Sequence, residues 1–187
     1  MAKIVAIAGS PSHPSRTYGI VEYALNLLAQ NKFETDFISV RDLPSEDLIF
    51  GRYDSPALEP AKALIQDASG LIVATPVYKA AYTGVLKSFL DLLPPKFLSG
   101  KVILPIATGG TIAHLLSIDY ALKPVLSELG AEYLLNGVYG VDKQIQRQEN
   151  GGFLLDEEIK QRLQKSVHDL EQTVEQISNL TEKLIPA

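Results

Sequence analysis

The sequence predicts an α/β domain in which helices cover both faces of a parallel sheet. Apolar runs of strand length alternate five times with amphipathic helical patterns, which favours right-handed crossovers between parallel strands. The first run, Lys3–Ala8, is almost continuously apolar, as expected of a strand buried on both faces. A length of 187 residues suits one domain, so we expect residues 1–187 to form a single unit.

Five segments have the pattern of strands: short, rich in branched or aromatic residues, and bounded by Gly, Pro or polar residues. The second is mixed in pattern, which suits the edge of a sheet. Pro105 falls inside the fourth, an awkward place for a residue that lacks a backbone N–H. The strands are expected at Lys3–Ala8, Glu34–Val40, Gly70–Thr75, Lys101–Thr108 and Glu132–Tyr139.

Five further segments carry apolar residues at three- and four-residue spacing, the pattern of amphipathic helices. The last keeps a heptad-like apolar seam, for which docking on the sheet is favoured over an isolated coiled coil. Residues 41–58 are expected to be irregular, and residues 140–155, polar and rich in Gly, to be mobile. The helices are expected at Thr17–Gln30, 59–68, Tyr82–Leu93, Ala113–Leu129 and 156–184.

Composition excludes several classes of function. A net charge of −5 without a basic run disfavours a nucleic-acid surface. The absence of Cys excludes disulfides and thiolate metal sites, and the three His show no ligand spacing, so we expect no metal. No run approaches a membrane span, and the N-terminal apolar run is too short for a signal peptide. We therefore expect a cytoplasmic protein that binds neither nucleic acid nor membrane.

The loop GSPSHPSRT, residues 9–17, joins the first strand to the first helix. Such a loop directs backbone N–H groups and the positive end of the helix dipole at one point, which favours an anion such as a phosphate. It lacks GxGxxG and the ending of a P-loop, and a plain helix cap at Ser15 is an equally good interpretation. The side chains that offer further donors are Ser10, Ser12, Ser15, Arg16 and Thr17.

A second loop follows the third strand. Pro76 directs the chain out of the sheet at a defined angle, Val77 and Tyr78 offer flat apolar surface, and Lys79 adds a positive charge. This combination suits a planar, electron-accepting heterocycle. A loop that merely covers the next helix has a similar composition.

Thr108, Gly109 and Gly110 form a third loop, at the end of the fourth strand. The glycines permit close approach of a ligand to the backbone, although a plain turn would also use them. Because the carboxyl ends of parallel strands meet at one edge of a sheet, we expect the three loops to build one ligand site.

The segment Ala113–Leu129 is apolar around too much of its circumference for a helix with one buried face. The excess favours a subunit interface over a deeply buried helix. Pro124 removes a helical hydrogen bond and should kink or widen the helix locally.

These motifs identify a resemblance to the flavodoxin-like NADPH-dependent FMN reductases, closely to the reductase components of bacterial two-component alkanesulfonate monooxygenases. The resemblance covers roughly residues 1–140, and the long run through residues 71–84 is its most specific part. It is carried by Ala8–Pro11 with Ser15 and Arg16, by Leu71–Gly84 with Leu86-Lys87 and Leu90–Pro94, by Ala107–Thr111 and by His114–Val125.

The resemblance implies a five-stranded sheet of order 2-1-3-4-5 and direct hydride transfer from NADPH to FMN, with FMNH₂ passed to a flavin-dependent monooxygenase. No catalytic acid or base is required, and Lys79 would tune the electrostatics. The FMN phosphate would lie on the first loop. The ring would lie against Pro76, Val77, Tyr78, Lys79, Thr108, Gly109 and Gly110.

The same resemblance implies a homo-oligomer, a dimer or tetramer, with Tyr120 in a locally widened helix at the interface beside Leu116 and Pro124. Two other functions stay open: an FMN-dependent quinone or azo reductase with tightly bound flavin, and a non-enzymatic flavodoxin that carries electrons. No residue of the sequence discriminates NADPH from NADH.

Overall fold

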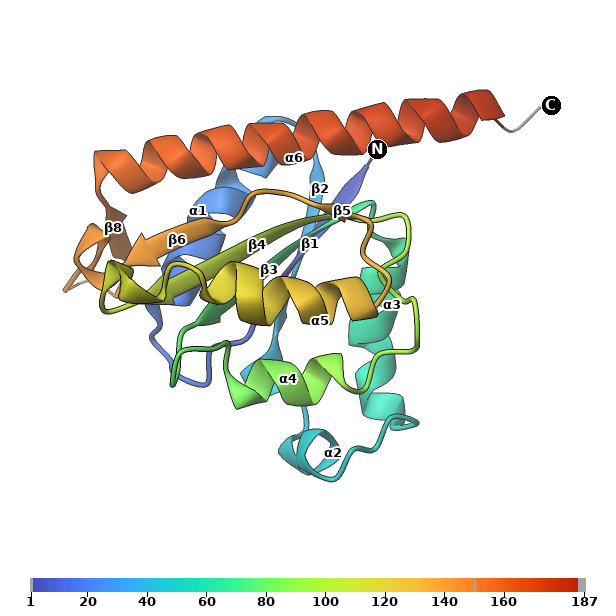
Figure 1. The fold of residues 1–187 in the computed structure, drawn as a ribbon, viewed down its shortest axis with the longest axis horizontal. Coiled ribbons are helices and arrows are strands. Elements are labelled where there is room, and N and C mark those ends of the chain that lie inside the picture. Colours follow the sequence, from blue (N-terminus) through green and yellow to red (C-terminus); the bar gives the residue numbers. More distant parts are fainter. Residues whose placement is uncertain (1, 150, 185–187) are drawn as a thin grey trace.

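The computed structural model describes residues 2–149 and 151–184 and confirms the parallel α/β fold (Figure 1). Its main sheet has the order β2-β1-β3-β4-β5, with β6 also paired to β4, as the flavodoxin-like prediction requires. All pairs in this sheet are parallel. Its first four strands are β1 (Lys3–Ala8), β2 (Glu34–Ser39), β3 (Gly70–Pro76) and β4 (Val102–Gly109).

The predicted fifth strand is divided into β5 (Tyr133–Leu134) and β6 (Val138–Val141), both paired with β4. Pro105 explains the division. The carbonyl of Ile103 accepts a bond from Leu135, on the β5 side of β4, and the carbonyl of Thr108 accepts one from Val77, on the β3 side. The backbone N–H and C=O groups of odd-numbered residues in β4 therefore point toward β5 and β6. Pro105 faces the gap between these two segments, where no N–H is needed.

Helices cover both faces of the sheet (Figure 1). On one face, alternate residues of β1, β3 and β4 pack against α3, α4 and α5, and on the other they pack against α1 and α6. The predicted seam of α6 docks on the sheet through Leu163, Val167, Leu170 and Val174, while the side chain of Leu184 lies outside the described residues. The helices are α1 (Arg16–Gln30), α2 (Ser45–Ile49), α3 (Glu59–Asp67), α4 (Gly84–Leu90), α5 (Lys123–Glu128) and α6 (Glu157–Leu184).

The single helix predicted over Ala113–Leu129 is wrong in detail. A 3-10 turn (Ile112–His114) and a π-helical turn (Ile118–Leu122) precede α5. The backbone N–H of Lys123 bonds to the carbonyl of Ile118, five residues earlier. Pro124 then lies in the first turn of α5, directly after the widened turn, where its missing N–H and ring are accommodated. The expected widening is present.

Two stretches are more ordered than predicted. Within residues 140–155, predicted to be a mobile loop, β7 (Ile145–Arg147) and β8 (Phe153–Leu155) pair as a hairpin, because Ile145 and Leu155 are buried beneath α1 and α6. Within residues 41–58, α2 is a helix whose end is fixed by the buried carboxylate of Asp47. No helix among residues 2–149 and 151–184 is long and apolar enough to cross a membrane.

Candidate functional site

A cavity of about 270 Å³ lies at the carboxyl ends of β1, β3 and β4. Eleven of the twelve residues predicted to hold the ligand line it, and the exception is Lys79. The three loops therefore meet at one place, as the parallel sheet requires. The cavity is lined by Ser10, Ser12, Pro14, Ser15, Arg16, Thr17, Pro76, Val77, Tyr78, Thr108, Gly109, Gly110 and Asp142.

One end of the cavity is the N-terminus of α1. Ser15 caps this helix, and its Oγ accepts a bond from the backbone N–H of Thr17 at 3.2 Å. The helix-cap interpretation of Ser15 is thus correct, yet the hydroxyl hydrogen stays available to an anion. Arg16 has two partners: its Nε donates to the carbonyl of Ile145 at 3.1 Å, and its Nη1 lies 3.5 Å from Asp142 Oδ2.

Buried hydrogen bonds connect the three loops. The hydroxyls of Thr17 and Thr108 lie 2.8 Å apart, joining the phosphate-type loop to the end of β4. The N–H of Val77 donates to the carbonyl of Thr108 at 2.7 Å, and Thr83 at the start of α4 donates to the carbonyl of Gly9. Since these groups are mutually satisfied within the fold, the cavity wall is held in place before a ligand arrives.

The loop after β3 makes a tight turn at Tyr78–Ala81, where two backbone bonds pair the outer residues. Lys79 and Ala80 occupy its corner with φ of 52° and 68°, a conformation that costs energy for any residue with a Cβ. The turn sends the Lys79 side chain outward, which explains its absence from the cavity wall. It also delays α4 to Gly84, two residues beyond the predicted start.

The glycine loop rests on a buried tyrosine that sequence reasoning did not single out. Tyr139 on β6 donates from its hydroxyl to the carbonyl of Thr111 at 2.7 Å. A Cβ placed on Gly109 would lie 2.4 Å from that hydroxyl oxygen. Burial raises the pKa of Tyr139, so its phenol stays protonated as a donor.

The predicted interface residues lie outside the cavity. Leu116 and Tyr120 are 62% and 56% exposed, and Pro124 is exposed as well. The Tyr120 hydroxyl donates to the carbonyl of Ala80. The π-helical turn thus contacts the loop after β3 directly.

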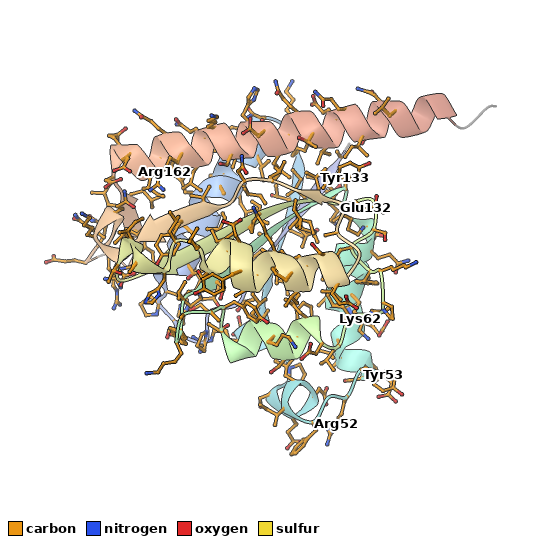
Figure 2. The ribbon with its side chains drawn as sticks, viewed as in Figure 1. Arg52, Tyr53, Lys62, Glu132, Tyr133 and Arg162 are labelled. Carbon is orange, nitrogen blue, oxygen red and sulfur yellow. The ribbon has the colours of Figure 1, made fainter. Side chains whose placement is uncertain are left out.

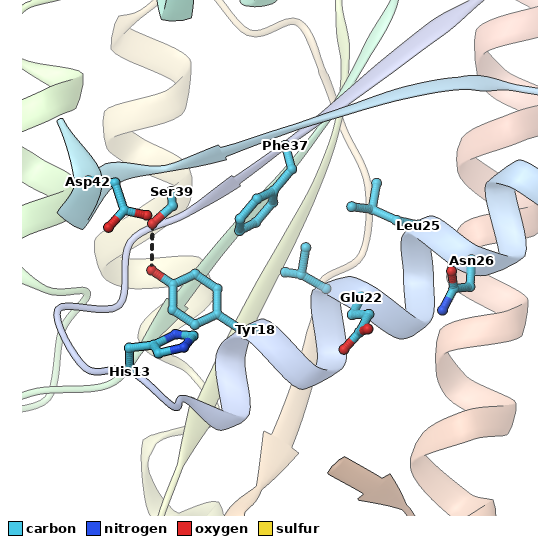
Figure 3. Close-up of a pocket in the computed structure, with 9 residues that line it drawn as sticks. His13, Tyr18, Glu22, Leu25, Asn26, Phe37, Ser39 and Asp42 are labelled. Carbon is cyan, nitrogen blue, oxygen red and sulfur yellow. Dashed lines mark hydrogen bonds between the residues drawn. The ribbon is translucent and has the colours of Figure 1, made fainter. Parts of the chain in front are cut away.

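A larger cavity, of about 420 Å³, lies between α1 and β2 (Figure 3). Its charged residues, Glu22 and Asp42, are both acidic, which disfavours a phosphate. Figure 3 shows the Tyr18 ring reaching Ser39, whose hydroxyl oxygen is 2.8 Å from that of Tyr18. Tyr18 donates to the carbonyl of Ser10 at 3.2 Å. This cavity therefore lies next to the loop of residues 9–17, to which Tyr18 is bonded. Burial raises the pKa of Tyr18.

The C-terminal third of the chain completes the site. Asp142 follows β6 at the same sheet edge and joins the cavity wall. Figure 2 shows Arg162 on α6. Its guanidinium donates to the carbonyl of Tyr139 at 2.9 Å and to Gln144 at 3.1 Å. The prediction missed these residues, although the position of Asp142 directly after the last strand is a signal that parallel topology offers.

The donor set fits a flavin mononucleotide. The helix N-terminus, the hydroxyls and Arg16 suit a phosphate. Val77 and Tyr78 offer apolar surface, and a Cβ on Gly110 would meet nothing within 4 Å, so this part of the loop is open to a ring. The strand order, together with a cavity at the carboxyl ends of the strands, defines a flavodoxin-like protein.

The model of the family "NADPH-dependent FMN reductase" matches residues 2–146, and the chain belongs to this family. It is 52% identical over 143 residues to the FMN reductase (NADPH) of Escherichia coli K12, covering 76% of this chain and 75% of that one. It is 45% identical over 166 residues to the FMN reductase (NADPH) of Pseudomonas putida KT2440, covering 89% and 83%.

The fold is also that of a solved NADH:FMN oxidoreductase, EmoB, in its apo form. The two chains superpose with a TM-score of 0.82 at 38% identity, over 92% of this chain and 90% of the other. This agreement extends the similarity past residue 146, where the family match ends.

Proposed function

We propose that this NADPH-dependent FMN reductase binds FMN in the 270 Å³ cavity, with the phosphate at the N-terminus of α1 and the ring against the other two loops. The observation that carries the assignment is the convergence of eleven predicted residues on one cavity at the ligand edge of the sheet. FMN and NADPH are the two substrates, in line with the family to which the chain belongs.

The phosphate is held by Ser10, Ser12, Ser15, Arg16 and Thr17. Within the described part of the chain, Arg16 supplies the one cationic side chain of the cavity wall, and a charge-assisted bond to phosphate is stronger than a neutral one. The hydroxyls and the N–H groups at the start of α1 supply the remaining donors. Pro76, Val77, Tyr78, Thr108, Gly109 and Gly110 shape the seat of the ring.

The bound flavin supplies the hydride acceptor, so no side chain has to act as an acid or a base. The role of the protein is to hold the nicotinamide ring of NADPH against the flavin ring in the orientation that hydride transfer requires. Lys79 lies on the exposed corner of its turn. Its contribution is a long-range positive potential that favours reduced flavin.

The reduced flavin is passed to a flavin-dependent monooxygenase of the alkanesulfonate type, in the cytoplasm. Exposed Leu116, Tyr120 and Pro124 form the interface of a homo-oligomer, together with Ile112 and Leu115, which are 60% and 44% exposed. Contiguous exposed apolar residues of this kind favour burial against another chain.

The decisive experiment mixes purified protein with NADPH and excess FMN and follows NADPH absorbance. Catalytic loss of absorbance is expected, and its absence refutes the proposal. Arg16→Ala should raise the KM for FMN about ten-fold, the equivalent of one lost charge-assisted bond. The KM for riboflavin, which has no phosphate, should stay unchanged. Arg147→Ala, an exposed arginine on β7 outside the cavity, is the matched control.

The same preparation separates the other two functions. A quinone or azo reductase with tightly bound flavin would purify yellow and give ping-pong kinetics, whereas flavin as a substrate gives nearly colourless protein and a sequential pattern. A stable one-electron semiquinone on reductive titration would indicate an electron carrier.

A further inference from the structure

The phosphate end of the cavity carries an acidic residue that a tight phosphate site would not need. Asp142 lines the same cavity as Arg16, and its Oδ2 lies 3.5 Å from Arg16 Nη1. Among the described residues that line this cavity, Arg16 and Asp142 are the only two with formally charged side chains. The wall that receives a dianionic phosphate therefore has no net side-chain charge.

Asp142 is not needed to position Arg16. The Nε of Arg16 already donates to the carbonyl of Ile145 at 3.1 Å, so the guanidinium has a hydrogen-bond partner that does not depend on Asp142. Both side chains of the pair are about half exposed, at 45% and 42%. An ion pair this exposed stabilises a fold by little, so stability does not account for the carboxylate either.

The segment that carries Asp142 is nevertheless fixed. The Gln144 side chain accepts a bond from the backbone N–H of Val141 at 3.1 Å and another from Arg162 at 3.1 Å. Arg162 also donates to the carbonyl of Tyr139 in β6 at 2.9 Å, so one side chain of α6 ties β6 to Gln144, at the end of the short segment between β6 and β7. The carboxylate is thus presented to the cavity by a rigid support.

We propose that Asp142 keeps FMN exchangeable, by competing with the flavin phosphate for Arg16 and repelling it from the cavity wall. The inference rests on the proposed function, in which FMN enters and leaves as a substrate. A phosphate that displaces the carboxylate from Arg16 leaves Asp142 beside a like charge, which lowers affinity and speeds release. The C-terminal segment sets the residence time of the flavin, and the loop after β1 supplies the attraction.

Asp142→Asn tests this, because it removes the charge and keeps the shape. The Kd for FMN, measured by quenching of flavin fluorescence, should fall about five-fold, with a slower dissociation rate in stopped flow. The Kd for riboflavin should not change. The affinity of the variant for FMN should also fall more steeply with salt than that of the wild type, since its cavity wall carries a net positive charge.

Asp169→Asn, an exposed aspartate on α6 outside the cavity, removes the same charge from the chain. It should leave the Kd for FMN, the FMN dissociation rate, the Kd for riboflavin and the salt dependence unchanged. Unchanged or weaker FMN binding by Asp142→Asn overturns the proposal, and weaker binding assigns Asp142 to positioning Arg16. An equal gain for riboflavin overturns it too, because the effect would then not involve the phosphate. Failure of the wild type to oxidise NADPH with FMN refutes the proposed function instead.

Discussion

Replacing Gly109 by Ala tests how the glycine loop is supported. The added Cβ would lie 2.4 Å from the Tyr139 hydroxyl oxygen and 3.3 Å from the ring carbon that bears it. Movement of Tyr139 would disturb its surroundings, because the residue is 1% exposed and its hydroxyl is bonded to the carbonyl of Thr111. Overpacking of a buried site costs about 1 to 3 kcal/mol, so we expect Gly109→Ala to lose about 2 kcal/mol.

The partner change Tyr139→Phe removes the oxygen that the Cβ would strike. By itself it should cost about 1 kcal/mol, the net value of one buried hydrogen bond. In the double variant the nearest ring atom stands 3.3 Å away, a contact that a shift of a few tenths of an ångström relieves. The double variant should therefore lose about 1 to 1.5 kcal/mol, well below the sum of about 3 kcal/mol from the single changes.

Urea unfolding of the four proteins, followed by far-UV circular dichroism, measures this coupling. Fluorescence titration with FMN on the same samples reports whether the loop still accepts the ring, and the affinity should follow the same order as the stability. Additive losses, with the double variant near 3 kcal/mol, would refute the idea that Tyr139 supports the loop by direct contact with Gly109.

Three further predictions concern the direction in which the free energy of unfolding changes. Gly19→Ala, which would ordinarily stabilise a helix, should cost about 1 kcal/mol because its Cβ would lie 2.6 Å from Phe153, and in a Phe153→Ala background it should become stabilising, both measured by urea unfolding. Ala80→Gly should raise the free energy of unfolding by about 0.5 kcal/mol, because at φ 68° a Cβ is sterically strained and glycine has none. The burial-raised pKa of Tyr139 means that its stabilising phenol persists below pH 10 and is lost as pH rises through the higher folded-state pKa. The stability difference between wild type and Tyr139→Phe, from urea unfolding at several pH values, should accordingly be constant below pH 10 and shrink above it.

The parallel sheet and the ligand edge were predictable because they depend on local patterns. Apolar runs identify β1, β3 and β4, and the rule for parallel strands then places their following loops together. The division of the fifth strand was not predictable from its own residues. It depends on which side of β4 Pro105 faces, and that is a property of the assembled sheet.

The order of residues 140–155 escaped prediction for a similar reason. A polar, glycine-rich stretch gives no periodic signal, yet three of its apolar residues, Ile145, Phe153 and Leu155, pack under helices from both ends of the chain. Its order comes from tertiary contacts. Asp142 belongs to this stretch. The sequence therefore predicted Arg16 as a cavity residue but did not predict Asp142, its acidic partner.

The turn at Tyr78–Ala81 shows why Lys79 differs from the other predicted residues. Two consecutive residues with a Cβ hold positive φ there, and such strain persists only where surrounding contacts fix the backbone. Those contacts are the paired bonds between Tyr78 and Ala81 and the bond from Tyr120 to the carbonyl of Ala80. A relaxed turn would be free to fold Lys79 over the cavity. The strained turn leaves Lys79 exposed on its corner, while Val77 and Tyr78 line the cavity.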